Sequence, residues 1–135
     1  MISLGAAVAW HALHAPQQTA LVFGEHRIDY AQLHRRVEAL AAALQVRGVG
    51  RGDIVALLMR NSIAFLELSL AVSRLGAVLL PINYRLANDE VVWILHHAGA
   101  TLLFVDDDLL ALAQGFEPVV AVTPDAQVDA VRALG

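Results

Sequence analysis

Polar residues that directly follow an apolar run are the side chains of this sequence best placed to do chemistry. The run AVLLPI, residues 77–82, predicts a buried strand, and Tyr84 and Arg85 come just after it. Ligands of open α/β sheets bind beyond the carboxyl ends of the strands. An arginine there suits a phosphate or carboxylate through its fork of N–H donors. The alternative is a solvent-facing Arg85 that pairs with Asp89 or Glu90.

A second polar group follows the apolar run that ends at Val105. Asp106 and Asp108 could hold Mg²⁺ through oxygen ligands. They also resemble the aspartate pair of haloacid-dehalogenase-type phosphatases, but that family has Thr or Val where this chain has Leu110, and it needs a later lysine, which is absent. We therefore favour a structural interpretation, in which Asp107 or Asp108 caps a short helix, and we assign no metal ligand.

The glycine-rich segment GVGRGD, residues 48–53, imitates a phosphate-binding loop. Such loops follow a strand and open a helix, so that amides at the helix start meet the phosphate. Here a helix ends and a strand begins, and the segment predicts a turn instead of a nucleotide site.

Histidine and serine give no candidate for metal binding or nucleophilic catalysis. His11 and His14 lie on one predicted helix, whereas His96 and His97 are adjacent and point to different faces. No third ligand has convincing spacing, and no serine stands in a nucleophile-elbow context. The sequence therefore predicts no catalytic residue.

Composition restricts the class of protein. The chain has 135 residues, 58% of them hydrophobic, and its mean hydropathy is +0.59. The best membrane span, residues 63–82, contains Glu67 and Arg74, each of which costs about 2.5–3.5 kcal/mol near a bilayer centre. We expect no membrane span, no nucleic-acid surface at a net charge of −4 without a basic block, and a cytoplasmic location because no signal peptide is evident.

Apolar runs alternate with helical patterns along the chain and predict a single α/β subdomain over residues 1–135, an open, mostly parallel sheet with helices on both faces. The predicted strands are residues 20–24, 26–30, 54–59, 77–82, 101–106 and 118–122. The predicted helices are residues 2–14, 30–47, 62–75, 88–98, 109–114 and 125–134.

Helix ends are marked by specific residues. Asp29 and Gln32 form an acidic version of the capping box before the second helix, and Gly48 supplies its left-handed stop. Asn88 is expected to cap the fourth helix, which Gly99 ends.

These segments together resemble the beginning of an AMP-forming acyl-CoA synthetase, of the superfamily that also holds luciferases and peptide-synthetase adenylation domains. The segment IDYAQL, residues 28–33, resembles the first core motif of that family, with Asp29 and Gln32 in place of the commoner Thr/Ser and Glu. The other similar segments are residues 48–83, NYRL at 83–86, Glu90 and LLFVDD at 102–107.

The resemblance implies a two-step reaction in the complete enzyme, with ATP, Mg²⁺ and CoA. A carboxylate attacks the α-phosphate of ATP to give acyl-AMP, and a thiol then displaces AMP. The family uses a Ser/Thr/Gly-rich loop that ends in Pro-Lys and a second lysine, but this chain contains no lysine and no such loop. In some relatives the arginine that matches Arg85 lies near the phosphates of CoA.

Two interpretations follow from the resemblance. In the first, the chain is the N-terminal portion of an acyl-CoA ligase, is inactive alone, binds no cofactor by itself, and has the remainder of the ligase as its partner. In the second, it is a stand-alone, non-catalytic α/β module. A portion cut from a larger domain exposes an apolar face, for which the helix at residues 62–75 is the candidate, and we expect self-association through such a face.

Overall fold

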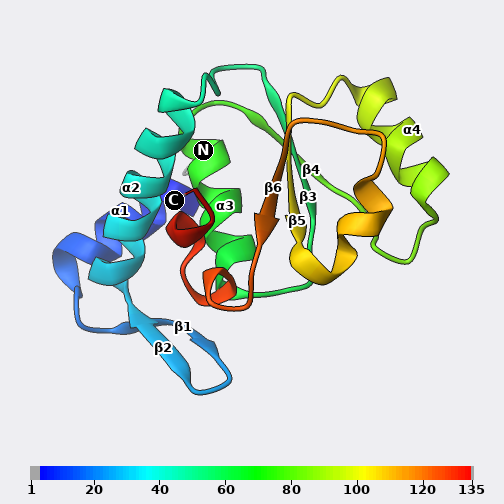
Figure 1. The fold of residues 1–135 in the computed structure, drawn as a ribbon. Coiled ribbons are helices and arrows are strands. Elements are labelled where there is room, and N and C mark those ends of the chain that lie inside the picture. The colour runs from blue at the N-terminus through cyan, green and yellow to red at the C-terminus, as the bar shows by residue number, and fades with distance from the viewer. Residues whose placement is uncertain (1–3, 135) are drawn as a thin grey trace.

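A four-stranded sheet in the order β4–β3–β5–β6 forms the centre of the fold (Figure 1). The computed structural model describes residues 4–134. All neighbouring strands of this sheet are parallel. The bounds are Ile54–Leu58 for β3, Val78–Pro81 for β4, Leu102–Asp106 for β5 and Val119–Val122 for β6. The continuous apolar runs thus became the strands that the sequence predicts.

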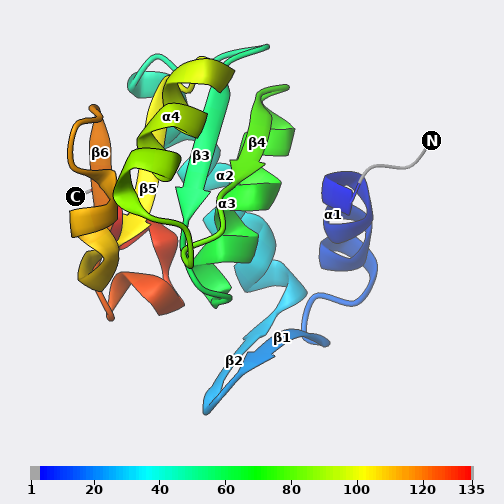
Figure 2. The same ribbon diagram turned by 90° about the vertical axis from the view of Figure 1, so that its right-hand side faces the viewer.

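Helices cover both faces of the sheet (Figure 2). On one face α3 (Ile63–Arg74) lies between the sheet and α2 (Tyr30–Val46), and α1 (Leu4–His14) packs mainly on α2. On the other face lie α4 (Asn88–Ala98) and the 3₁₀ segment η1 (Asp107–Ala113). The predicted fold class is confirmed. Residues 2 and 3 of the predicted first helix lie outside the described residues.

An antiparallel hairpin precedes α2. Its strands are β1 (Thr19–Phe23) and β2 (His26–Asp29), and Gly24 turns between them at φ 60°. Figures 1 and 2 both show this hairpin extending away from the body of the molecule. Phe23 and Val22 near its tip are exposed apolar side chains.

The start of α2 follows the sequence in detail. Asp29 Oδ1 accepts the Gln32 backbone N–H at 2.8 Å, and Gln32 Oε1 accepts the Asp29 backbone N–H at 3.0 Å, so the capping box is present. After the helix, Gly48 takes φ 88°, a left-handed conformation that glycine adopts without steric cost.

The expected cap of α4 is wrong. The N-cap position is Ala87, whose N–H donates to Glu90 Oε1 at 3.0 Å. The Asn88 side chain instead donates to the backbone carbonyls of Leu112 and Gln114, at 2.8 and 3.0 Å. Asn88 therefore fastens η1 to α4, a long-range role that the local sequence does not indicate.

The expected helices at 109–114 and 125–134 are also wrong in type. The first is η1, and the second is a pair of short 3₁₀ segments, η2 (Ala126–Val128) and η3 (Ala130–Leu134). Asp129 between them is extended, with φ −161° and ψ 96°. The Ala130 N–H donates to the Glu67 side chain of α3 at 3.0 Å, so a tertiary contact replaces the hydrogen bond that would continue a helix.

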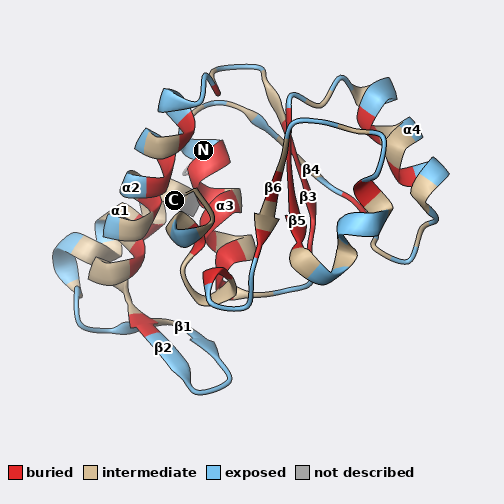
Figure 3. Ribbon diagram, viewed as in Figure 1, coloured by how far each residue is buried: buried red, intermediate tan, exposed pale blue. Residues whose placement is uncertain are grey.

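Helix α3 is not the uncovered apolar face that the sequence suggested. Seven of its residues are buried, because α2, η2 and η3 pack on the side that the sheet leaves free (Figure 3). Within residues 4–134, no helix is long and apolar enough to cross a membrane.

Candidate functional site at the carboxyl ends of the strands

The carboxyl ends of β3, β4 and β5 bring three polar groups together. Arg60 follows β3, Tyr84 and Arg85 follow β4, and Asp106 and Asp108 stand at the end of β5. A hollow of about 450 Å³ opens at this edge. Its lining residues are Phe23, Arg60, Asn61, Ser62, Asp106, Asp107, Asp108, Pro124 and Gln127.

Arg60 links β3 to the end of β5. Its backbone N–H donates to Asp106 Oδ2 at 2.9 Å, and its guanidinium lies 2.9 Å from Asp108 Oδ2 and 3.6 Å from Asp106 Oδ2. The hydrogen bond to Asp108 raises the pKa of the Arg60 guanidinium. Burial raises the pKa of the Asp106 carboxyl, and the Arg60 N–H opposes this shift. The backbone N–H and Nη1 of Arg60 therefore already have anionic partners.

Arg60 is not among the residues predicted from the sequence, although its position carries a usable signal. Arg60 follows the apolar run IVALLM just as Arg85 comes shortly after AVLLPI, so the same argument about strand ends applies to both.

The aspartates at the end of β5 do not act as expected. No side chain of Asp107 or Asp108 caps η1, because Asp108 pairs with Arg60. The cap prediction is therefore wrong. In the described part of the chain, no group of three or more histidines, aspartates or glutamates could hold a metal ion.

Tyr84 lies between two arginines. The guanidinium carbons of Arg60 and Arg85 lie 5.2 and 5.5 Å from the centre of its ring, within cation–π range. The Arg85 backbone N–H donates to Asn83 Oδ1 at 2.9 Å, which shapes the turn.

The Arg85 side chain is exposed and, within residues 4–134, forms no ion pair with Asp89 or Glu90. Arg85 is thus solvent-facing, as the structural alternative predicts, but the predicted ion pair with Asp89 or Glu90 is absent among residues 4–134. Its guanidinium donors are available to an anion that approaches the carboxyl edge of the sheet.

The segment GVGRGD forms a turn at the opposite end of β3. Asp53 Oδ2 accepts the Gly50 backbone N–H at 2.7 Å, and Gly52 takes φ 82°. The turn prediction is confirmed.

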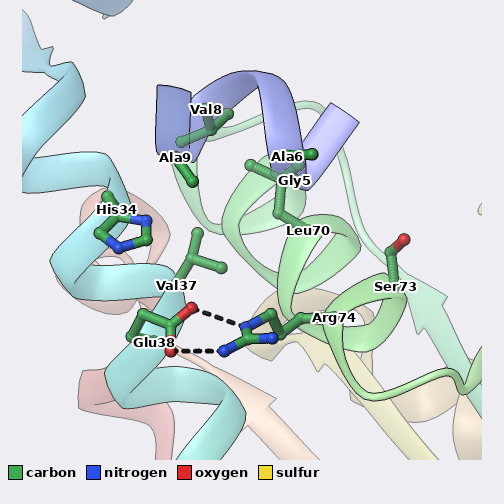
Figure 4. Close-up of a pocket in the computed structure, with 10 residues that line it drawn as sticks. All are labelled: Gly5, Ala6, Val8, Ala9, His34, Val37, Glu38, Leu70, Ser73 and Arg74. Carbon is green, nitrogen blue, oxygen red and sulfur yellow. Dashed lines mark hydrogen bonds and ion pairs between the residues drawn. The ribbon is translucent and has the colours of Figure 1, made fainter. Parts of the chain in front are cut away.

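A second hollow, of about 400 Å³, lies between α1, α2 and α3, away from these residues (Figure 4). Glu38 of α2 accepts two hydrogen bonds from Arg74 of α3, at 2.7 and 3.1 Å. The hydrogen bond from Arg74 lowers the pKa of the Glu38 carboxyl. Because the charges of Glu38 and Arg74 are paired with each other, Arg74 is not a free cation for a phosphate in this hollow.

A family model and a curated relative both match most of this chain. The family model described as "AMP-binding enzyme" matches residues 8–134. The fatty acid–[acyl-carrier-protein] ligase ScoC of Streptomyces coeruleorubidus is 36% identical over 127 residues, which are 94% of this chain and 23% of that protein.

Solved structures extend the likeness to the fold. A fatty acyl CoA synthetase of Mycobacterium tuberculosis superimposes with a TM-score of 0.82 at 30% identity, over 96% of this chain and 27% of that one. The N-terminal subdomain of Klebsiella oxytoca NpsA, in complex with 3-hydroxybenzoyl-AMSN, gives 0.80 at 29% identity, over 90% and 30% of the two chains. This chain thus spans about a quarter of the length of such relatives.

Proposed function

This chain belongs to the family of AMP-binding enzymes, and from that membership we propose that it is the N-terminal part of an ATP-dependent acyl-CoA ligase. The complete enzyme activates a carboxylic acid as acyl-AMP and transfers the acyl group to the thiol of CoA. The observation that carries the proposal is the family match over residues 8–134, in a chain that covers 23% of its relative ScoC.

The 135 residues alone do not adenylate an acid in this proposal. Attack on the α-phosphate of ATP needs dense positive charge and N–H donors around the phosphates. The chain has no lysine, its glycine-rich segment forms a turn before β3, and Arg60 is already paired with two aspartates. The machinery for the first step therefore lies in the remainder of the ligase, which is the partner of this chain.

ATP–pyrophosphate exchange tests whether adenylation requires the remainder of the ligase. We expect no acid-dependent exchange by the purified 135-residue chain, and exchange by a protein that continues in frame through a Ser/Thr/Gly-rich loop ending in Pro-Lys. Exchange by the short chain alone would overturn the proposal. A gene without such a continuation would favour a stand-alone, non-catalytic module.

Arg85 is the residue of this chain that we assign to the second step, as a ligand of a CoA phosphate. The assignment is supported by its place beyond β4, by its exposed guanidinium without a carboxylate partner in residues 4–134, and by the stacking of Tyr84 beside it. A planar fork of donors suits a phosphate at such an edge.

A further inference from the structure

A buried carboxyl group holds the last described segment of the chain against the helices. Glu67 of α3 is 1% exposed, and its Oε1 accepts the Ala130 backbone N–H at 3.0 Å. Arg36 of α2 donates to the Val128 carbonyl at 2.8 Å. Figure 1 shows this segment, in red, lying against α3 and α2.

Glu67 is a buried carboxyl whose one ion pair among the described residues is long. Arg36 Nη1 lies 3.8 Å from Glu67 Oε2, beyond hydrogen-bond distance. Asp129 is a second carboxylate in the same neighbourhood, and its Oδ1 is buried without a hydrogen-bond partner among the described residues. Asp129 Oδ2 pairs with Arg132 at 3.6 Å. Burial is therefore the main factor that opposes ionisation of Glu67, Arg36 partly offsets it, and the Asp129 carboxylate adds a smaller repulsion.

Protonation of Glu67 would correct this arrangement. A neutral carboxyl keeps an oxygen that accepts the Ala130 N–H and gains an O–H donor. A neutral Glu67 also avoids the cost of a buried charge.

We propose that Glu67, Arg36 and Asp129 form a proton-controlled clasp that docks residues 126–134 onto α2 and α3 when Glu67 is protonated and loosens them when it ionises. The proposal does not depend on the ligase function.

Among residues 4–134, one other buried carboxyl faces the docked segment: Asp106 lies beside Gln127 of η2, and burial raises its pKa. The charged side chains that face Glu67 are Arg36 from α2 and Asp129 from the segment, and Arg132 reaches them through Asp129. Strand β4 has no titratable residue, and His11 of α1 stacks on Tyr30.

The direction of the pH effect follows from the Glu67 titration. Burial, its largest cause, raises the pKa of Glu67 from 4.5 to about 7. A raised carboxyl pKa means that docking is most favourable below pH 4.5 and weakens as the pH rises through about 7. If the undocked segment leaves Glu67 with its ordinary pKa, the docking equilibrium falls about tenfold between pH 6 and pH 8.

Hydrogen–deuterium exchange of the full chain at pH 6 and pH 8, corrected for the intrinsic exchange rates, tests the clasp. We expect protection of residues 126–134 to fall about tenfold at the higher pH, while β3 and β5 keep theirs. Equal protection at both pH values, or a loss shared by β3 and β5, would overturn the proposal.

Two variants distinguish a pH effect of Glu67 on the docked segment from a change in the stability of the whole fold. Glu67→Gln keeps the acceptor for Ala130 and adds an amide donor, so it should remove the pH dependence. Glu38→Gln is the matched control, because Glu38 joins α2 to α3 through Arg74 without touching the segment, and it should keep the dependence. Persistence of the dependence in Glu67→Gln contradicts the proposal.

A second variant keeps the test decisive if Glu67→Gln does not fold. Asp129→Asn removes the like charge while leaving Glu67 in place, so the midpoint of the pH dependence should move to lower pH. An unmoved midpoint would show that Asp129 does not act on Glu67, and the clasp would be wrong.

Discussion

Arg85 and Arg60 stand at neighbouring strand ends but differ in what their guanidinium groups contact. Arg60 pairs with Asp106 and Asp108, whereas Arg85 has a ring contact with Tyr84 and no ion pair in residues 4–134. In a complete enzyme, Arg85→Ala should therefore raise the KM for CoA, by about tenfold for one lost charge-assisted contact. The rate of acyl-AMP formation, measured by ATP–pyrophosphate exchange, should be unchanged.

The matched control for Arg85 is Arg74→Ala. Arg74 is also an exposed arginine, but it pairs with Glu38 between α2 and α3, far from the strand ends. This change should leave the KM for CoA as it is. An equal loss of both half-reactions in Arg85→Ala would mean that Arg85 supports the fold of the turn and does not contact CoA.

A substitution at the start of helix α4 can distinguish an N-cap residue from one that hydrogen-bonds a distant segment. An N-cap accepts hydrogen bonds, so aspartate replaces asparagine there without loss. Asn88 instead donates to the carbonyls of Leu112 and Gln114, which aspartate cannot do. Asn88→Asp should therefore lower the free energy of unfolding by about 1–2 kcal/mol, as measured by urea denaturation.

Asp29→Asn is the control, because Asp29 does cap α2 through its side-chain oxygen. It should change the free energy of unfolding by no more than a few tenths of a kcal/mol. If both variants are equally stable, the hydrogen bonds of Asn88 to η1 contribute nothing measurable.

These two residues also show how far sequence reasoning reaches. Asp29 and Gln32 act within one helical turn, so their spacing alone predicts the start of α2, and unbroken apolar runs likewise predict the strands. Asn88 and Glu67 bond to residues 24 and 63 or more positions away, and no local pattern reports such partners. The C-terminal segment was therefore expected as a helix, although Glu67 binds its backbone.

The same limit applies to the candidate site. The position of Arg85 beyond a strand end follows from the run before it, and the sheet brings it near Arg60 and Asp106 as parallel topology requires. The pairing of Arg60 with Asp108 depends on the strand order, in which β5 lies beside β3. That order is not fixed by the spacing of residues along the chain.

The molecule is rich in apolar residues, and its core does not bury all of the large apolar side chains. Helix α3 is covered, but large apolar side chains remain exposed on several elements: Trp10, Leu13, Val22, Phe23, Val46, Val78, Trp93 and Leu110. Val22 and Phe23 lie near the tip of the β1–β2 hairpin, which extends from the body, and a two-stranded hairpin has little stability of its own. The tip of the hairpin thus replaces α3 as the candidate site of self-association.

We therefore propose that the isolated chain self-associates through this hairpin, since association would remove Val22 and Phe23 from water. Light scattering over a range of concentrations should show a mass above 14.5 kDa that rises with concentration. The double variant Val22→Thr, Phe23→Thr places threonine, which favours strands, at both positions and should shift the chain toward monomer. Val46→Thr, at a still more exposed position at the end of α2, should not have this effect. A chain that stays monomeric at high concentration would contradict the proposal.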